Sequence, residues 1–352
     1  MTNFCTLFDH NYLSRGLILY ESLCSYCSDS FTLYILTTDD IAYNWLKSHP
    51  HNNIIINSIA DITCVYPILE QLKKERTQAE FNWTLSSFSL QFFLNKYHLS
   101  SLTYLDADLC FYADPKILFD ELDKKESVII TPHNYTPKYD QTATSGRYCV
   151  QFMYFKNTTS GNMVLEWWRN ECEKCCSAIP KNGKFGDQKY LDDWLSRFSG
   201  IVHETKNMGC GIAPWNIQQF NIERIHNKFI VEDKVTRIRE DLVFYHFHGV
   251  KDFISKNGSL VFNLNDYELS DAVIDYLYKP YIKKLKDLVI ELPERDFPII
   301  VPHQKKLPFV YIIFKAIIRS VKMLIKSFLF IQTIKQVKNE YINNLSKENI
   351  LT

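Results

Sequence analysis

The stretch Thr103-Tyr-Leu-Asp-Ala-Asp-Leu-Cys-Phe-Tyr-Ala-Asp-Pro115 places two carboxylates, Asp106 and Asp108, between two short apolar runs. The first run predicts a buried strand that leads into an acidic turn. In extended backbone, residues two apart point to the same side, so both carboxylates can face one ligand. Like charges this close resist burial unless a cation neutralises them, and hard divalent ions such as Mg²⁺ or Mn²⁺ prefer such oxygens. The stretch therefore predicts a divalent-metal site, with an ordinary solvated turn as the alternative.

The overall composition is that of a globular protein with a large core. The 352 residues are 46% hydrophobic, and the formal net charge is zero. This length accommodates one large α/β domain with an appendage, or two domains. We expect no nucleic-acid partner, since proteins that bind nucleic acid carry a basic excess or a basic face.

Ten cysteines include the pairs Cys24-x-x-Cys27 and Cys172-x-x-Cys175. The first residues of the chain lack the basic and long apolar regions of a signal peptide, so we expect a reduced, cytosolic protein. The two pairs lie far apart in the sequence, and the first falls within a predicted helix. Ordinary buried thiols are therefore favoured over a zinc site.

The N-terminal third alternates between strands and helices. Apolar runs predict strands at residues 4–8, 31–36 and 54–56, and helical spacing of apolar residues predicts helices at 13–26, 65–76 and 85–97. This order is typical of an α/β fold with a mostly parallel sheet. No Gly-rich loop follows the first strand, which disfavours a dinucleotide-binding fingerprint or a P-loop.

The rest of the chain continues this alternation. Further strands are predicted at 128–130, 148–155 and 243–249, and helices at 117–122, 163–176 and 267–288. Asp187 follows Gly186 where a helix would begin, so it is either an N-cap or a site residue. The strand at 243–249 ends in two histidines and a glycine, and residues 135–147 are expected to form a loop beside the site.

The C-terminal segment is basic, because residues 301–352 hold nine Lys or Arg against two Glu. Within residues 309–331, four basic residues recur at helical spacing among apolar ones, Lys315, Arg319, Lys322 and Lys326. Such a helix is too charged to span a bilayer but suits an anionic membrane surface. The alternative is a helix packed on the protein's own core with a solvated basic edge.

Four separate motifs, in order over residues 3–253, resemble those of bacterial nucleotide-sugar glycosyltransferases with the metal-dependent GT-A fold. Within that group the chain is most similar to the family 8 type of hexosyltransferase and to related lipopolysaccharide or O-antigen enzymes. The resemblance implies an α/β, Rossmann-like, mostly parallel mixed sheet flanked by helices. It leaves the C-terminal hundred residues unexplained, apart from a general habit of basic, amphipathic tails in such enzymes.

The first two motifs are implied to hold the nucleotide and a metal. The first strand ends in Asp9, Asn11 and Tyr12, which match the turn that holds the uridine in the family. Asp106 and Asp108 match the Asp-x-Asp that binds Mn²⁺ on the donor diphosphate, with Asp106 also counted among the donor-binding residues.

The last two motifs are implied to complete the metal site and to contact the sugar. His246, three residues before Gly249, matches the third metal ligand, and Lys251 lies close enough in sequence to contact the phosphates. Asp187 and Gln188 match the pair below the reacting sugar. The resemblance thus assigns two catalytic residues and three metal ligands.

A turn-rich loop before the last strand carries Trp215 and Asn216. We take both as candidate sugar or acceptor contacts, with simple packing of the loop as an equal alternative.

Together the motifs predict a glycosyltransferase that uses Mn²⁺ or Mg²⁺ to move a hexose or N-acetylhexosamine from a UDP-sugar. The expected acceptor is a lipid-linked glycan or polysaccharide, in lipopolysaccharide, O-antigen or capsule assembly. We expect the protein at the inner face of the cytoplasmic membrane, bound peripherally through residues 309–331. Residues 1–263 would form the transferase domain, 264–300 a C-terminal helix and linker, and 301–352 the basic tail.

The stereochemical outcome is open at the level of the residues. Retention is favoured, with Gln188 stabilising an oxocarbenium-like state. The alternative is inversion with Asp187, Asp192 or Asp193 as general base.

Two departures from the family pattern concern donor and acceptor handling. The usual Lys-Pro-Trp is replaced by Lys251-Asp252-Phe253, displaced by one residue, and the basic residue often found before the Asp-x-Asp is missing from 81–93.

Two rival functions are weighed against the transferase. A sugar-1-phosphate nucleotidyltransferase is disfavoured because residues 6–13 contain neither glycine nor Lys nor Arg. A non-catalytic, membrane-associated scaffold is disfavoured by the intact Asp-x-Asp and by His246.

Overall fold

The computed structural model describes residues 1–254, 260–264 and 266–292. Apart from parts of β13 and β14, the features below belong to one unit of the chain, Met1–Asp252 with Phe262–Phe297. Almost all of the other unit, residues 253–261 and 298–352, lies outside the described residues. The predicted linker, the basic tail at 301–352 and its membrane-binding helix at 309–331 therefore remain predictions.

Strands and helices intermix along the first half of the described chain, as predicted. Its elements are β1 (Thr2–Phe8), η1 (His10–Tyr12), α1 (Leu13–Tyr26), β2 (Phe31–Thr37), α2 (Asp40–Ser48), β3 (Ile54–Ser58), α3 (Ile59–Val65), α4 (Ile68–Glu75), α5 (Gln78–Lys96), β4 (Ser101–Leu105), β5 (Leu109–Phe111), α6 (Lys116–Phe119), β6 (Val128–Pro132), α7 (Thr142–Ser145), β7 (Tyr148–Lys156) and α8 (Thr159–Lys174).

The second half contains shorter elements. They are η2 (Lys189–Asp193), α9 (Trp194–Arg197), β8 (Val202–Glu204), η3 (Ile217–Gln219), β9 (Phe220–Ile225), β10 (Lys228–Asp233), β11 (Arg239–Asp241), β12 (Phe244–His246), β13 (Lys251–Ile254), β14 (Leu260–Asn263), α10 (Asp271–Val273), η4 (Ile274–Tyr278) and α11 (Lys279–Glu291). Among the described residues, no helix combines the length and apolarity needed to cross a membrane.

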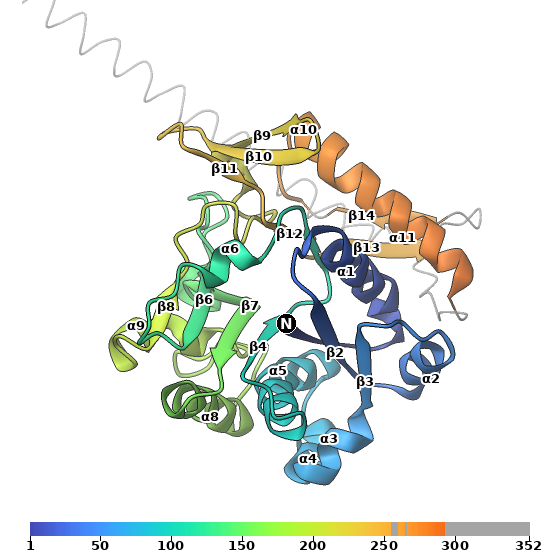
Figure 1. Cartoon of the computed structure of the whole chain (residues 1–352), viewed down its shortest axis with the longest axis vertical. Coiled ribbons are helices and arrows are strands. Elements are labelled where there is room, and N and C mark those ends of the chain that lie inside the picture. The colour runs from blue at the N-terminus through green and yellow to red at the C-terminus, as the bar shows by residue number, and fades with distance from the viewer. Residues whose placement is uncertain (255–259, 265, 293–352) are drawn as a thin grey trace, which may run out of the picture. The chain divides into compact units, whose positions relative to one another are not determined.

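A seven-stranded sheet in the order β3-β2-β1-β4-β7-β6-β8 forms the centre of the fold (Figure 1). Its pairings are parallel except at β7, which runs antiparallel to both β4 and β6. The predicted mostly parallel, mixed sheet is therefore confirmed. Because β1 and β4 are parallel neighbours, the residues that follow them, Asp9 and Asp106, emerge at the same edge of the sheet.

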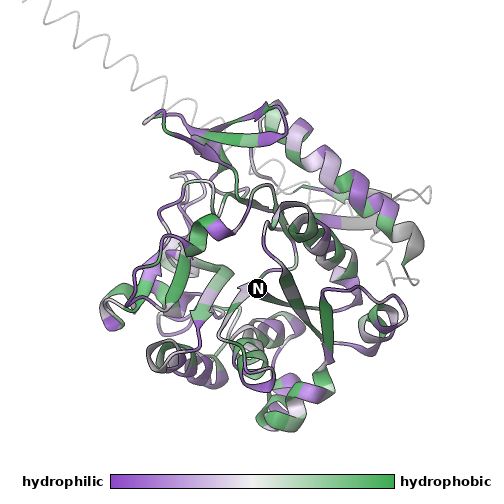
Figure 2. Cartoon of the chain, in the orientation of Figure 1, coloured by the Kyte–Doolittle hydropathy of each residue, from purple (hydrophilic) through white to green (hydrophobic). Residues whose placement is uncertain are grey.

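Both faces of the sheet are buried under helices, and strand β1 shows how its sequence achieves this. Phe4 and Phe8 pack on one face with apolar residues of α1, whereas Cys5 and Leu7 pack on the other with α5 and α8. This alternation follows from the two-residue period of a strand. The strands are accordingly mostly hydrophobic in Figure 2, and α5 and α8 lie on the side of the sheet away from α1 in Figure 1.

Several predicted helix boundaries differ from the structure, and two of the differences have a clear local reason. The helix predicted at 65–76 is interrupted at Pro67, where α3 ends and α4 begins, because proline disfavours helical backbone in the preceding residue. The helix predicted at 85–97 starts earlier, at Gln78, because Thr77 and Glu80 form a capping box that closes its N-terminus. The longer α5 lies directly below the site.

Candidate functional site

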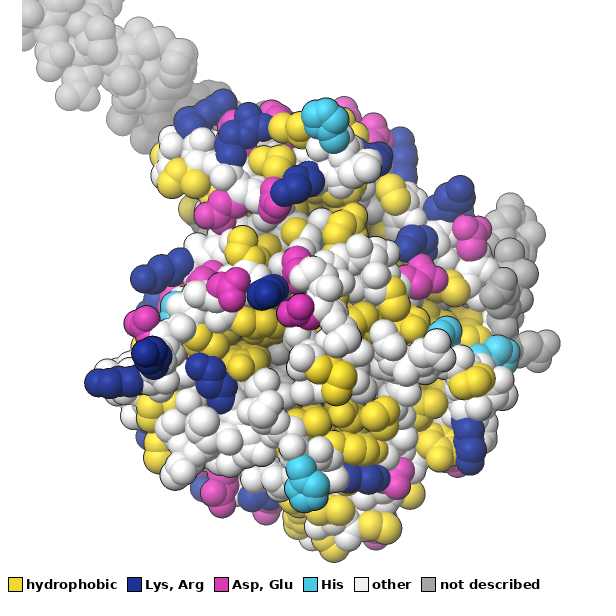
Figure 3. Space-filling model, viewed as in Figure 1, with side chains coloured by type: hydrophobic (Ala, Val, Ile, Leu, Met, Phe, Trp, Pro, Cys, Tyr) yellow, Lys and Arg dark blue, Asp and Glu magenta, His cyan; other side chains and the backbone are white. Residues whose placement is uncertain are grey.

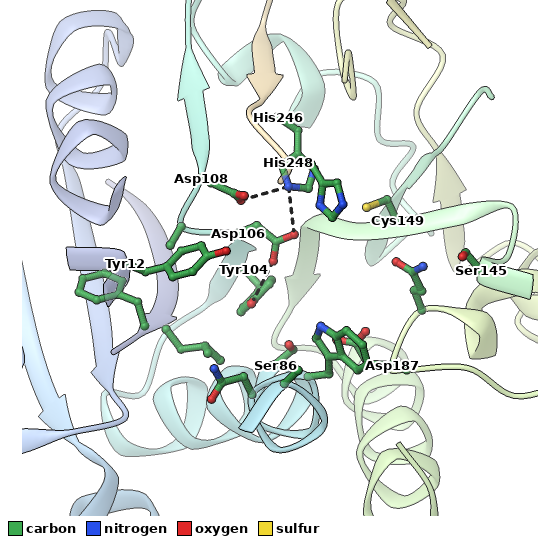
Figure 4. A pocket seen from close by; sticks show the side chains of 18 of the residues that line it. Tyr12, Ser86, Tyr104, Asp106, Asp108, Ser145, Cys149, Asp187, His246 and His248 are labelled. Carbon is green, nitrogen blue, oxygen red and sulfur yellow. Dashed lines mark hydrogen bonds and ion pairs between the residues drawn. The ribbon is translucent and has the colours of Figure 1, made fainter. Parts of the chain in front are cut away.

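A cavity of about 700 Å³ opens at the sheet edge where β1 and β4 end (Figure 4). This volume is within the range of pockets that bind small ligands and cofactors. Four aspartates and three histidines line it, Asp9, Asp106, Asp108, Asp187, His133, His246 and His248. Among its described lining residues none is Lys or Arg. Figure 3 shows Lys and Arg side chains scattered over the face in view, interspersed with acidic ones.

Asp106, Asp108 and His246 meet at the centre of the cavity (Figure 4). Both aspartates follow β4, and the antiparallel pairing of β5 with β12 sets His246 opposite Leu109. The Nε2 atom of His246 is 3.0 Å from Asp108 Oδ1 and 3.8 Å from Asp106 Oδ2. The imidazole therefore faces two carboxylates that the sequence places more than 130 residues away.

The buried residue Gln151 fixes the orientation of this histidine. Its Oε1 lies 2.7 Å from His246 Nδ1, and because an amide oxygen only accepts hydrogen bonds, Nδ1 carries the proton. The same residue anchors the acidic turn, since its carbonyl accepts a hydrogen bond from the Asp106 N–H at 3.0 Å. Nε2 is thereby directed at the carboxylates, as in metal sites where a second residue sets the tautomer.

The protonation states show how strongly these three side chains interact. Although burial favours the neutral carboxyl, His246 lowers the pKa of Asp108 to about 2. Burial dominates at Asp106 and raises its pKa to about 6, against the pull of His246. Burial disfavours the charged imidazole, yet Asp108 raises the pKa of His246 well above its usual value. The ring thus acts as the counter-ion of the acidic turn.

This set of side chains fits a divalent cation. Two carboxylates and one imidazole, converging in a buried cavity with a second residue fixing the imidazole, are a common ligand combination for Mn²⁺. Two further groups reach the same centre. Asp106, Cys149 and His246 have donor atoms within 4.8 Å of one another, and so do Asp108, His246 and His248.

We expect Gln151→Leu to weaken Mn²⁺ binding by about 10- to 100-fold, the loss typical of a residue that orients a metal ligand. Without the amide oxygen, Nδ1–H loses this acceptor, so Nε2 is less firmly reserved for the metal. Gln151→Glu is the matched control, because a carboxylate oxygen also accepts from Nδ1–H. Calorimetric Mn²⁺ titration measures both, and equal affinities in Gln151→Leu and the wild type would contradict this role.

The turn after β1 brings Asp9, Asn11 and Tyr12 to the cavity, as the sequence suggested. The Asp9 carboxylate accepts hydrogen bonds from the N–H groups of Asn11 and Tyr12, at 2.9 and 3.3 Å, and so caps η1. The Tyr12 ring is 42% exposed and lies over the Arg15 guanidinium, 4.7 Å from the ring centroid. Asp9 thus shapes the turn, while Asn11 and Tyr12 line the cavity, with the Asn11 amide donating to Asp9 Oδ2 at 3.3 Å.

Asp187 and Gln188 also line the cavity. The N-cap position that the sequence offered to Asp187 is held by Gln188, at the start of η2. Asp187 is 5% exposed, and its backbone carbonyl accepts a hydrogen bond from Trp168 Nε1 at 2.8 Å. Burial first, and then the charge of Asp106, raise the pKa of its carboxyl to about 7, whereas a hydrogen bond from Ser86 opposes that rise.

The raised pKa of Asp187 predicts an unusual pH dependence of stability in the metal-free protein. Between pH ~4 and ~7 the folded state holds a proton that the unfolded carboxyl has lost, so stability falls as pH rises through this window. Asp187→Asn removes this cost. The free energy of unfolding of the variant, relative to wild type, should therefore rise from pH 4 to pH 7 by on the order of a few kcal/mol. Urea unfolding across this range measures it, and a difference that does not vary with pH would contradict the burial of a neutral carboxyl.

The loop after β8 holds Trp215 and Asn216 in different roles. Trp215 lines the cavity, and its Nε1 donates to the His133 carbonyl at 3.0 Å. Asn216 is 1% exposed and does not line the cavity. Its amide donates to the carbonyls of His133 and Gly211 and accepts from Ala213 N–H, so it holds the loop together.

Lys251 is the other candidate that the structure does not bring to the cavity. Its side chain is exposed, and it is absent from the cavity lining. The structure therefore assembles nine of the eleven candidate residues around one cavity and leaves Asn216 and Lys251 outside it. It adds Gln151, Cys149 and His248, of which only His248 had a signal in the sequence, as the second of two histidines before a glycine.

Comparison with known proteins supports this architecture. No family model matches the chain. The uncharacterized Bacillus subtilis (strain 168) protein YfnF is 30% identical over 255 residues, covering 70% of this chain and 81% of YfnF. YfnD of the same strain is 28% identical over 304 residues, covering 84% of this chain and 92% of YfnD.

Among solved structures, the galactosyltransferase LgtC in complex with donor and acceptor sugar analogs has a similar fold. It aligns with a TM-score of 0.50 at 9% identity, over 84% of this chain and 97% of that chain. At this level of identity the likeness concerns the fold, and it confirms the predicted GT-A architecture of the described region.

Proposed function

Because the chain belongs to the family of YfnF and has the GT-A fold, we propose that it is a metal-dependent glycosyltransferase. It would move a hexose or N-acetylhexosamine from a UDP-sugar to a glycan acceptor. One observation carries the proposal: His246 faces the two carboxylates of Asp106 and Asp108, in a cavity at the edge of the sheet where β1 and β4 end.

The reaction needs charge stabilisation more than a strong base. Transfer of the sugar breaks the bond between its anomeric carbon and the diphosphate, which leaves with the electron pair and gains negative charge. A Mn²⁺ or Mg²⁺ ion held by Asp106, Asp108 and His246 would supply positive charge to this leaving group. Since the described cavity lining contains neither Lys nor Arg, the metal site is the main cationic element available there.

The nucleotide and the sugar would occupy opposite ends of the cavity. Tyr12 offers a half-exposed aromatic face for the uracil, and Asn11 offers an amide for hydrogen bonds to it. Asp187 and Gln188 would contact the sugar, with Asp187 in hydrogen-bond contact with sugar hydroxyls. Because four aspartates and neither Lys nor Arg are among the described lining residues, the cavity favours a neutral sugar over a uronic acid, whose carboxylate would be buried without a basic partner.

Retention of configuration is the outcome we favour, with Gln188 as the polar group beneath the sugar ring. Inversion requires a carboxylate that takes the proton of the acceptor. Of the carboxylates weighed for that role, Asp192 is bound by the Arg147 N–H and Lys189, and Asp193 by Arg197. Neither side chain is among the described residues that line the cavity. Their contacts and their position therefore argue against Asp192 and Asp193 as the general base.

The proposed acceptor is a lipid-linked glycan or polysaccharide, in lipopolysaccharide, O-antigen or capsule assembly. Support comes from the aromatic side of the cavity, where Tyr135 and Tyr267 offer partly exposed rings on which a sugar can stack. We place the protein at the cytoplasmic membrane surface, on the strength of the basic stripe at 309–331.

Turnover of a UDP-sugar panel tests this function. The full chain would be incubated with each donor, with and without Mn²⁺, and UDP release measured beside that of Asp106→Ala. Release with one donor that needs Mn²⁺ and is lost in the variant would support the proposal and identify the sugar. Metal-independent release would contradict it, and a folded protein that neither binds nor turns over any donor would favour the non-catalytic scaffold.

A further inference from the structure

Cys149 lies at the metal centre but has no part in the proposed reaction. It is the second residue of β7, is 5% exposed and lines the cavity. Its sulfur, an Asp106 oxygen and a His246 ring nitrogen lie within 4.8 Å of one another. Figure 4 shows Cys149 and Asp108 on opposite sides of His246.

We propose that Cys149, His246 and Asp106 form a Zn²⁺ site that overlaps the Mn²⁺ or Mg²⁺ site, so that zinc inhibits the enzyme. The binding site follows from the geometry alone, whereas the inhibition rests on the proposed function. The ligand is a borderline-soft divalent cation, which the three side chains recognise by their sulfur, nitrogen and oxygen donors.

The donor set distinguishes zinc from the harder ions. Zn²⁺ binds Cys, His and Asp at about 2.0 to 2.3 Å in tetrahedral geometry, which separates neighbouring donors by less than about 4 Å. Donor atoms already within 4.8 Å need only small movements to reach that arrangement. A fourth position remains for water. Mg²⁺ and Mn²⁺ gain little from a thiolate, because they prefer oxygen ligands.

Because Cys149 is buried, a purely packing role is the alternative. Its position at the cavity favours a metal-binding role instead. Cys149 packs with Ala213 and Trp215 in a small apolar cluster, as many buried thiols do. Yet among the ten cysteines it alone lines the cavity, as far as the described residues show. Cys210 is equally buried, at 4% exposure, but contacts Thr131 instead of the metal centre.

Zinc at this position would exclude the catalytic ion. Both sites use His246 and Asp106, so one ion must leave before the other binds. Coordination converts the thiol to a thiolate and releases its proton to solvent, with no change of oxidation state. By the general order of affinities, Zn²⁺ binds a nitrogen-containing site more tightly than Mn²⁺, so low zinc concentrations would compete effectively.

Co²⁺ provides a test that requires no turnover, because a cobalt–thiolate bond gives a charge-transfer absorption band in the near ultraviolet. The full chain would be titrated with Co²⁺ beside Cys149→Ser, Cys149→Ala and the control Cys210→Ser. We expect the band in the wild type and in Cys210→Ser, and its reduction or loss in both Cys149 variants. Zn²⁺ should abolish it, and the Zn²⁺ affinity from this competition should fall by more than about 10-fold in the variants.

The outcomes separate this inference from the proposed function. No band in the wild type, or an undiminished band in folded Cys149 variants, would overturn the zinc site whatever the catalytic result. If a donor is turned over, Zn²⁺ should inhibit in competition with Mn²⁺, and the inhibition constant should rise more than about 10-fold in Cys149→Ser. Turnover that is equally zinc-sensitive in that variant would overturn the inhibitory role and leave the transferase assignment intact.

Discussion

Asp108→Asn is expected to lower kcat/KM for the nucleotide-sugar donor by about 10²- to 10³-fold or more, the cost of removing one element of charge stabilisation. The carboxylate is buried and 3.0 Å from His246 Nε2, and His246 lowers its pKa to about 2. An asparagine keeps the shape but removes the charge that would hold the metal beside the leaving diphosphate. Steady-state UDP release at saturating Mn²⁺ measures the effect.

Asp120→Asn is the matched control for this variant. Asp120 follows the same acidic stretch, but it is exposed and does not line the cavity. Its substitution should leave kcat/KM within about two-fold of wild type, because isolated surface substitutions have small effects. Similar activity in Asp108→Asn and Asp120→Asn would remove Asp108 from the reaction.

The second large effect concerns stability. Trp168→Ala should reduce the free energy of unfolding by about 3–5 kcal/mol, since the side chain is fully buried and leaves a cavity. The ring packs against Trp194 at 5.9 Å between centroids and lies parallel to Phe155 at 6.3 Å. Urea denaturation provides the measurement.

Two further variants separate packing from hydrogen bonding at this position. Trp168→Phe keeps an aromatic ring but loses the hydrogen bond to the Asp187 carbonyl, a loss of about 1 kcal/mol beyond that of volume. Trp45→Ala is the control, because Trp45 is only partly buried and should cost less. Equal destabilisation by Trp45→Ala and Trp168→Ala would show that α8 is not a principal part of the core.

Periodicity and local signals were enough to predict most of the fold. The apolar run at residues 4–8 and the helical spacing in α1 identified the first strand and helix, and helix 13–26 was predicted to the residue. Pro67 and the Thr77–Glu80 pair are also visible in the sequence, and they explain the two wrong boundaries in the predicted helices 65–76 and 85–97. Apolar residues at helical spacing can continue across the end of one helix and the start of the next. The spacing alone therefore does not reveal the boundary.

Fewer of the site residues could be predicted from the sequence, because the pairing of distant strands brings them together. Asp106 and Asp108 were found from their charge between apolar runs, and His246 from the family resemblance. Gln151 and Cys149 had no such signal, since each lies in an apolar strand. The pairing of β4 with β7 brings Gln151 and Cys149 beside the acidic turn, and the pairing of β5 with β12 brings His246 to the same centre.

The central claim is that Asp106, Asp108 and His246 hold a divalent ion on which the donor diphosphate binds. Calorimetric titration of UDP into the full chain, with and without Mn²⁺, tests it most directly, using the wild type and Asp108→Asn. We predict that Mn²⁺ strengthens UDP binding by at least about 10-fold in the wild type and has little effect in the variant. UDP binding of equal affinity with and without Mn²⁺ in the wild type would contradict the account.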